Sequence, residues 1–460
     1  MKSFAVVKLI PLLLFCHWLL PAAAAVSAEI QGPLVIVTSF PKTLFSRYKE
    51  AFEKRHPEVS VFIRSKKTTT AITFVQERQS EPVDIFWASS PDAFEVLKKT
   101  GDLVPFFKPS VAGAANIGGY PLDDPDGCYR GFAVSGFGIT WNTTYLKQYK
   151  LEVPKSWDDL KRPEYGKHVG ISAPSRSGTT HLIVETILQG KGWQEGWALL
   201  LEMGGNLATV TARSFGVPAG VEDGRFGIGP VIDFFGLSAR RTGAAMDFVY
   251  PDNTVYLPAN IGIVKRSSNR EAALAFVDFV LSTEGQKILF EPQISRLPVD
   301  REIYQSAPAD YPNPFSETFA AKGIGFDTEL SRKRYHVVNG LFDIMITYRL
   351  KALRRAWKGI HRAEKNLADH PASLPRLEAK LSRARRLAAG VVISETQASA
   401  ESLVSVYRPR KPGLPISAHQ VDREHDWQKM SRQNLTEALR LAEEILEELT
   451  LLEAEKKDDR

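Results

Sequence analysis

Short apolar runs alternate with helical patterns over residues 33–314 of the chain. The runs at 34–39, 59–64 and 84–90 have the length and residue types of buried strands, and the stretches that follow them predict helices. Regular alternation of this kind favours an α/β fold. Small polar residues end three of the strands, at Thr38-Ser39, Ser89-Ser90 and Ser175. Because ligands of open α/β sheets bind beyond the carboxyl ends of the strands, we expect the site at that edge.

The pattern changes beyond Pro314, where proline and glycine become sparse and Ala, Leu, Glu, Lys and Arg dominate. Apolar residues recur at steps of three and four over 338–356, including Met345 and Tyr348, and again over 435–449. Such stripes suit antiparallel or coiled helix packing. We therefore expect an all-helical extension at 316–460. It either packs back on the preceding domain, or it docks a partner or a second copy of the chain. The second alternative draws on the apolar stripes and on the cations Lys351, Arg354, Arg355, Lys358 and Arg362.

Residues 1–28 have the pattern of a cleavable signal peptide. Lys2 and Lys8 flank a basic start, 9–20 is an apolar run, and Val26-Ser27-Ala28 offers a cleavage site before Glu29. The run is shorter than the roughly 20 residues that a membrane span needs. No later segment is long and apolar enough to cross a bilayer. The sequence predicts a protein exported to the periplasm and not an integral membrane protein.

Composition and motifs narrow the function classes. A net charge of +6 over 460 residues is mild and, with export, argues against nucleic acid as a partner. A Gly-x-Ser-x-Gly elbow, a His-Glu-x-x-His pair, a Cys/His cluster and a Gly-rich phosphate loop are all missing from the sequence. We therefore expect a binding protein rather than an enzyme, with no cofactor and no metal site.

The segment 167–188 carries the most specific chemistry in the chain. A strand-like run leads through Pro174 into Ser175-Arg176-Ser177-Gly178-Thr179-Thr180 and then into a helical pattern. A helix that begins with these residues offers unpaired backbone N–H groups, hydroxyls and the positive end of its dipole to a small anion. The alternative is an ordinary Ser/Thr N-cap.

Several motifs in this order resemble the type 2 periplasmic solute-binding proteins of ABC importers, in the branch with ferric-iron and phosphonate binders. The motifs are the Thr38-Ser39 strand end, 82–85 leading to Ser89, 138–142, 154–160 with 163–166, the Ser-Gly-Thr-Thr helix start, 258–264, and 272–286. Within that family, the helical extension is similar to the regulatory binding proteins of phosphoglycerate transport, which are thought to signal through a membrane sensor kinase.

The resemblance implies a solute-binding domain at 29–315 with two lobes that close over one ligand, with hinge strands near 137–142 and 249–263. One lobe would contribute Thr38, Ser39, Thr69 and Ser89, and the other Ser175, Ser177, Gly178, Thr179 and Thr180. Arg213 lies among threonines and a serine and could bind phosphate or carboxylate, although a lone arginine is more often solvated.

Asp233-Phe234-Phe235 occupies the place where iron-binding members usually carry paired tyrosines. Phenylalanine has no oxygen for ferric iron, so the departure favours an organic anion. Asp233 could accept a hydrogen bond from the ligand or serve only the fold. The expected function is capture of a small anionic, phosphorylated or phosphonate-type solute for an ABC transporter permease. The alternatives are ligand sensing with a membrane sensor kinase and ferric-ion transport.

Overall fold

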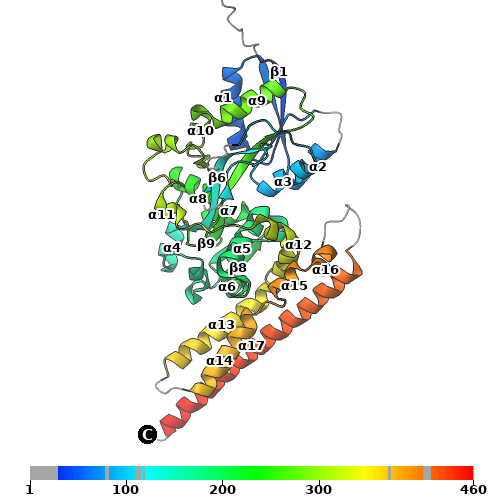
Figure 1. The fold of residues 1–460 in the computed structure, drawn as a ribbon. Coiled ribbons are helices and arrows are strands. Elements are labelled where there is room, and N and C mark those ends of the chain that lie inside the picture. Colours follow the sequence, from blue (N-terminus) through cyan, green and yellow to red (C-terminus); the bar gives the residue numbers. More distant parts are fainter. Residues whose placement is uncertain are drawn as a thin grey trace, which may run out of the picture.

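The structure is a computed structural model that describes residues 30–77, 82–109, 116–117, 120–370, 374–407 and 416–458. Two α/β lobes lie one above the other, and a long helical bundle extends from the lower lobe (Figure 1). The expected α/β fold with a helical extension is confirmed. The signal peptide predicted at 1–28 lies outside the described residues, as does the side chain of Thr69.

Lobe one is built on parallel strands. β1 (Gly32–Thr38) pairs with β2 (Val59–Ser65) on one side and with β3 (Ile85–Ala88) on the other. Alternate side chains of β1 enter two apolar cores, Leu34 and Ile36 on one face and Val37 on the opposite face. The helices of this lobe are α1 (Lys42–Arg55), α2 (Thr68–Gln76), α3 (Pro91–Lys99), α9 (Arg270–Leu281) and α10 (Thr283–Ile288).

One long strand connects the lobes. β6 (Arg130–Asn142) pairs along its first half with β11 (Tyr256–Ile263), which continues the lobe-one sheet next to β3. Its second half pairs with β9 (Ile228–Ile232) and β10 (Met246–Val249) of lobe two. A single strand of 13 residues therefore belongs to both lobes. Short pairs are formed by β4 (Asn116–Ile117), β5 (Tyr120–Pro121) and β12 (Leu297–Pro298).

Lobe two contains the parallel strands β7 (Val169–Ser172), β8 (Leu207–Thr211) and β9. Gly170 is required in β7 because an added Cβ would lie 2.2 Å from the ring of Phe226. The helices are α4 (Thr143–Tyr149), α5 (Gly178–Lys191), α6 (Trp193–Asn206), α7 (Gly216–Glu222) and α8 (Asp233–Arg241). The 3-10 segments of the chain are η1 (Asp158–Lys161), η2 (Pro163–Tyr165), η3 (Pro174–Arg176), η4 (Glu302–Ser306), η5 (Thr347–Arg349) and η6 (Ser405–Tyr407).

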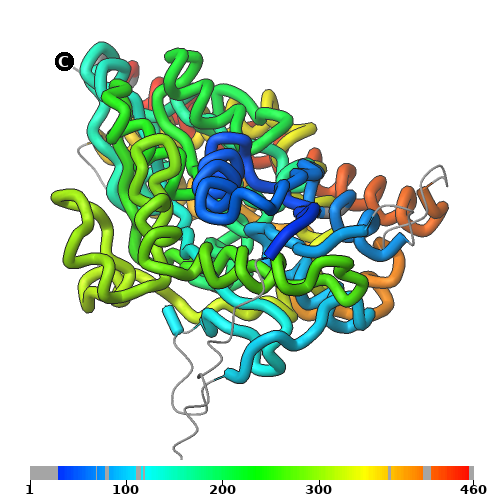
Figure 2. Tube along the Cα trace, turned by 90° about the horizontal axis from the view of Figure 1, so that it is seen from above, coloured from blue at the N-terminus to red at the C-terminus, as the bar shows by residue number. Residues whose placement is uncertain are grey.

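The C-terminal helices form a bundle that packs on lobe two. Their bounds are α11 (Glu317–Ala320), α12 (Thr328–Met345), α13 (Leu350–Ala368), α14 (Pro375–Ala389), α15 (Glu395–Ser399), α16 (Glu401–Val404) and α17 (Ala418–Asp458). α13 and α14 lie along α17, and α13 also contacts α6 (Figure 1). The end of the bundle that holds α15 and α16 projects to one side of the lobes in the view from above (Figure 2). No helix among the described residues has the length and apolarity of a membrane span.

The apolar stripe predicted over 338–356 does not form one helical face. The chain breaks its helix at η5, and Tyr348 is 60% exposed, whereas Val338 and Ala356 are fully buried. The stripe on α17 is partly covered as expected, since Leu435, Ala442 and Leu449 are buried. α13 and α14 cover this stripe, and α13 also packs on α6 of lobe two, so the apolar residues of the bundle join the core of lobe two.

Candidate functional site

The polar residues that end β1 and β3 lie at one edge of the lobe-one sheet. Thr38 is level with Trp87 in the register, and Asn260 of β11 is level with Ala88. The Thr38 hydroxyl is buried and accepts a hydrogen bond from the backbone N–H of Phe40 at 3.1 Å. Ser39 Oγ and both polar atoms of the Asn260 amide are buried without a partner among the described residues. Buried polar groups are normally hydrogen-bonded, so this edge offers free donors and acceptors to a ligand.

The start of α5 holds the second group of predicted residues. Ser177 is the N-cap, and its Oγ accepts from the Thr180 N–H at 3.1 Å and from the Thr180 hydroxyl at 3.0 Å. Thr180 and Ser172 also share a hydrogen bond. Ser175 and Gly178 are exposed, and an added Cβ on Gly178 would meet nothing within 4 Å. The N-cap geometry is thus present, and the helix start is open on its outer side.

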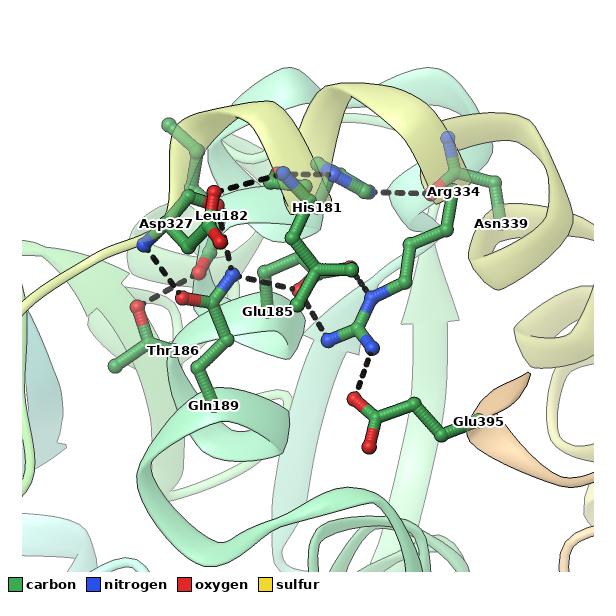
Figure 3. A network of polar contacts seen from close by, with 11 residues as sticks. His181, Leu182, Glu185, Thr186, Gln189, Asp327, Arg334, Asn339 and Glu395 are labelled. Atoms are coloured by element: carbon green, nitrogen blue, oxygen red, sulfur yellow. Dashed lines mark hydrogen bonds and ion pairs between the residues drawn. The ribbon is translucent and has the colours of Figure 1, made fainter. Parts of the chain in front are cut away.

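A buried polar network holds α5 against α12 directly behind this helix start (Figure 3). His181 Nδ1 donates to Asn339 Oδ1 at 2.9 Å, and His181 Nε2 accepts from the Ser331 hydroxyl at 3.1 Å. Arg334 donates to both oxygens of Glu185, at 2.9 and 2.8 Å, and to Glu395 at 2.6 Å. The position of α5 is therefore fixed by the C-terminal helices.

Acidification is expected to destabilise the protein through His181. Burial lowers the pKa of this histidine from 6.5 to about 4. Because its folded pKa lies below its unfolded pKa, its contribution is complete above pH 6.5 and is lost as the pH falls towards 4. The loss should reach about 3 kcal/mol over that window. Urea unfolding at several pH values should show a shallower pH dependence for His181→Gln. The exposed His419→Gln is the control and should keep the wild-type slope; equal slopes for both variants would contradict the assignment.

A cavity of about 370 Å³ lies between α1 of lobe one and α7 and α8 of lobe two. Phe234, Phe235 and Phe215 form much of its apolar wall, and Arg296 contributes a guanidinium. None of the site residues predicted from the sequence lines it. The structure therefore divides the polar features of the lobes into three groups: the strand ends of lobe one, the start of α5, and this cavity.

Arg296 is a buried arginine that contacts aromatic rings from both lobes. Its guanidinium lies 5.0 Å from the ring centroid of Phe40 and 4.0 Å from that of Phe234, so it sits between aromatic rings of the two lobes. Its one side-chain hydrogen bond in the described part of the chain goes to Ser135 Oγ at 3.4 Å, and no carboxylate there forms an ion pair with it. Burial lowers the pKa of Arg296 to about 10. The buried Asp233 carboxylate acts on this guanidinium electrostatically without a direct ion pair. A buried cation without a direct ion-pair partner is costly, which makes this position suited to an anionic ligand.

Asp233 uses its carboxylate within the protein. Oδ2 accepts from the Gly136 N–H at 2.6 Å and from the Tyr250 hydroxyl at 3.0 Å, and Oδ1 accepts from the Phe234 N–H at 2.7 Å. Burial nevertheless raises the pKa of Asp233 to about 6. These three hydrogen bonds indicate that Asp233 anchors the start of α8. Contact between Asp233 and a ligand stays a prediction.

The remaining predicted residues are partly exposed. Arg213 is partly exposed, and its backbone carbonyl accepts from the Thr211 hydroxyl at 2.9 Å. Ser89 and Thr179 are also partly exposed. Each of the three is available to a ligand, but the structure does not bring them to one point.

Sequence reasoning missed Arg296 and Asn260. A signal was present for both, since Asn260 interrupts the apolar strand Tyr256–Ile263 and Arg296 stands next to the β12 residues Leu297 and Pro298. A polar or charged residue inside an apolar run is the pattern that marks a buried functional group.

Known proteins resemble the chain in sequence. The phosphoglycerate transport regulatory protein PgtC of Salmonella typhimurium is 36% identical over 237 residues, which cover 51% of this chain and 58% of that protein. The chain thus matches less than two thirds of that relative's length. An uncharacterized protein of Haemophilus influenzae is 27% identical over 283 residues, which cover 59% of this chain and 80% of the relative.

Solved structures share the fold. The periplasmic binding protein AfuA of Actinobacillus pleuropneumoniae, with exogenous fructose-6-phosphate bound, gives a TM-score of 0.57 at 21% identity and covers 68% of this chain and 98% of that one. Iron-bound HitA of Pseudomonas aeruginosa gives 0.52 at 19% identity, covering 62% and 92%. Residues 80–328, more than half of the chain, match the bacterial extracellular solute-binding proteins, and the chain belongs to that family.

Proposed function

We propose that the protein captures a small anionic organic solute between its two lobes, in the periplasm, and delivers it to the permease of an ABC importer. One observation carries the proposal: the buried Arg296 lines the cavity between the lobes, and its guanidinium forms no ion pair among the described residues. A guanidinium presents several N–H donors in one plane, and their spacing matches the oxygens of a phosphate or carboxylate. In this proposal the protein acts as a receptor for the solute and not as an enzyme.

A phosphorylated or phosphonate-type solute is the favoured class. The name of PgtC refers to phosphoglycerate transport, and the AfuA structure contains fructose-6-phosphate. Ferric ion is a poorer candidate, because Phe234 and Phe235 supply rings without oxygen to the cavity wall. The proposed contacts are Arg296, Ser39 and Asn260, together with the start of α5.

Closure of the lobes would bring these groups onto one ligand. β6 runs through both lobes, which supports the proposed hinge near 137–142 and 249–263 within a binding domain at 29–315. Since the ligand would contact both lobes, it would favour the closed state.

Ligand sensing is a second candidate, favoured by the regulatory name of PgtC and by the helical extension. Arg334 links Glu185 of α5 to Glu395 of the extension, which supports a path from the binding lobes to the bundle. A membrane sensor kinase would be the partner in that case.

Thermal unfolding with matched solutes tests the proposal. Fructose-6-phosphate is compared with fructose, 3-phosphoglycerate with glycerate, and an aminophosphonate with its parent amine. A ligand at 100 times its Kd stabilises the folded state by about 2.7 kcal/mol, so a true solute raises Tm clearly. We expect a rise with one of the phosphorylated or phosphonate solutes and none with the matched compound that lacks the phosphorus group. A rise with ferric ion alone would refute the anionic class.

A further inference from the structure

One side of α13 carries an unbroken row of cations, which we call the basic face. It consists of Lys351, Arg355, Lys358, Arg362 and Lys365, all of them exposed. Steps of four, three, four and three residues keep these side chains within roughly 80° of one another around the helix. The row extends for about 21 Å along the helix axis.

The basic face is not neutralised within the described chain, where none of its five residues forms an ion pair. The neighbouring helix behaves differently. Arg376, Lys380 and Arg383 of α14 all bind glutamates of α17, at 3.2 to 3.3 Å. The single acid of α13, Glu364, points to Arg385 of α14 at 2.8 Å. The cations of α14 that face α17 are thus paired, whereas this row of α13 has no ion-pair partner among the described residues.

The opposite side of α13 is fixed in the core. Leu353, Trp357 and Ile360 are buried, and Arg354 donates to the carbonyl of Leu207 in β8 at 2.6 Å. The helix cannot roll to hide its cations without exposing these residues. α13 also has no large exposed apolar side chain in the range Leu350–Ala368.

We propose that the basic face docks on an anionic phospholipid surface. Protein interfaces depend on buried aromatic and apolar anchors, which this face lacks, whereas phosphate headgroups bind cations at any position along such a row. Each cation near an anionic bilayer strengthens association roughly fivefold, so five cations together strengthen it on the order of a thousandfold. Without an apolar anchor, the attachment is reversible and sensitive to salt. This inference does not depend on the identity of the solute.

Sedimentation with lipid vesicles tests the inference on the full mature protein. Vesicles of phosphatidylglycerol and phosphatidylcholine are compared with pure phosphatidylcholine, at low and at physiological salt. The test variant is Lys351→Gln/Arg355→Gln/Lys358→Gln/Arg362→Gln. Glutamine has a helix propensity close to that of lysine and arginine, so α13 should remain folded. The variant should lose binding to the anionic vesicles by about a hundredfold or more.

The matched control changes four exposed lysines outside the basic face: Lys147→Gln/Lys155→Gln/Lys265→Gln/Lys287→Gln. Both variants have the same net charge, and the control should keep wild-type vesicle binding. The inference would be overturned by equal losses of binding in the two variants or by equal binding to neutral and anionic vesicles. Binding to soluble polyglutamate but not to vesicles would also overturn it, and would indicate an acidic protein partner. Solute binding is measured on both variants and should not change.

Discussion

Arg296→Met is expected to remove most of the affinity for the anionic solute and to leave the free energy of unfolding within about 1 kcal/mol of the wild-type value. The guanidinium is buried and forms no ion pair in the described chain, so its removal breaks no direct carboxylate contact. It does withdraw a positive charge that lowers the pKa of the buried Asp233, and the relieved desolvation cost has to offset that loss as well. The loss of contacts to Phe40 and Phe234 is offset by relief of the desolvation cost. A hydrogen bond to a charged group contributes about 1.5–3 kcal/mol, which corresponds to a loss of affinity of roughly 10- to 150-fold.

Titration calorimetry and urea unfolding measure the two quantities separately. Arg241→Met is the matched control, because Arg241 is a nearby arginine that donates to the carbonyl of Phe290 at 2.5 Å and to Ser295 Oγ at 3.2 Å but does not line the cavity. It should lose stability and keep the affinity. If Arg296→Met instead loses several kcal/mol of stability with its affinity intact, Arg296 has a structural role.

The sequence predicted the elements of the lobes well because local pattern decides them. The helix expected after the strand at 34–39 is observed at Lys42–Arg55, and the strand expected at 59–64 is observed at Val59–Ser65. Alternating apolar residues and turn residues act over a few positions, so neighbours in the sequence carry the information. The boundaries of the binding domain and of the extension stay predictions.

The break between α12 and α13 could not be predicted from the same pattern. The residues 346–350 contain neither proline nor glycine, and the spacing of apolar residues continues across them. The helix ends at Met345, and the fully buried Ile346 that follows has φ −117° and ψ −61°, which is distorted from ideal α-helical values. Tertiary packing, which the spacing does not record, decides this position.

The candidate site was predicted in part for the same reason. Small polar residues at strand ends are a local signal, and Thr38 and Ser39 do lie at the expected sheet edge next to β3. The sequence singles out Arg213 because its neighbours in the sequence are polar, and it does not point to Arg296. What distinguishes Arg296 is its contact with Phe40 and Phe234, which lie far away in the sequence. Whether any of these residues binds the solute stays a prediction.

Arg334→Met is expected to lower the free energy of unfolding by about 3–5 kcal/mol. Arg334 and Glu185 are both fully buried and share two hydrogen bonds. Removal of the arginine leaves the Glu185 carboxylate buried without its cation, and that uncompensated charge accounts for the loss. Arg332→Met, on the same helix, breaks an exposed ion pair with Glu329 and should cost less than about 1 kcal/mol.

The double variant Glu185→Leu/Arg334→Met removes both charges. It therefore separates the net contribution of the ion pair to stability from the penalty of leaving one buried charge unpaired. Buried ion pairs are often replaceable by apolar residues, so the double variant should recover much of the stability lost in Arg334→Met. Urea unfolding gives the free energies of unfolding of the wild type, Arg334→Met, Arg332→Met and the double variant. A double variant less stable than Arg334→Met would contradict this account. Hydrogen exchange should localise the effect. Amides of α5 should exchange faster in Arg334→Met, because this ion pair and His181 hold α5 against α12.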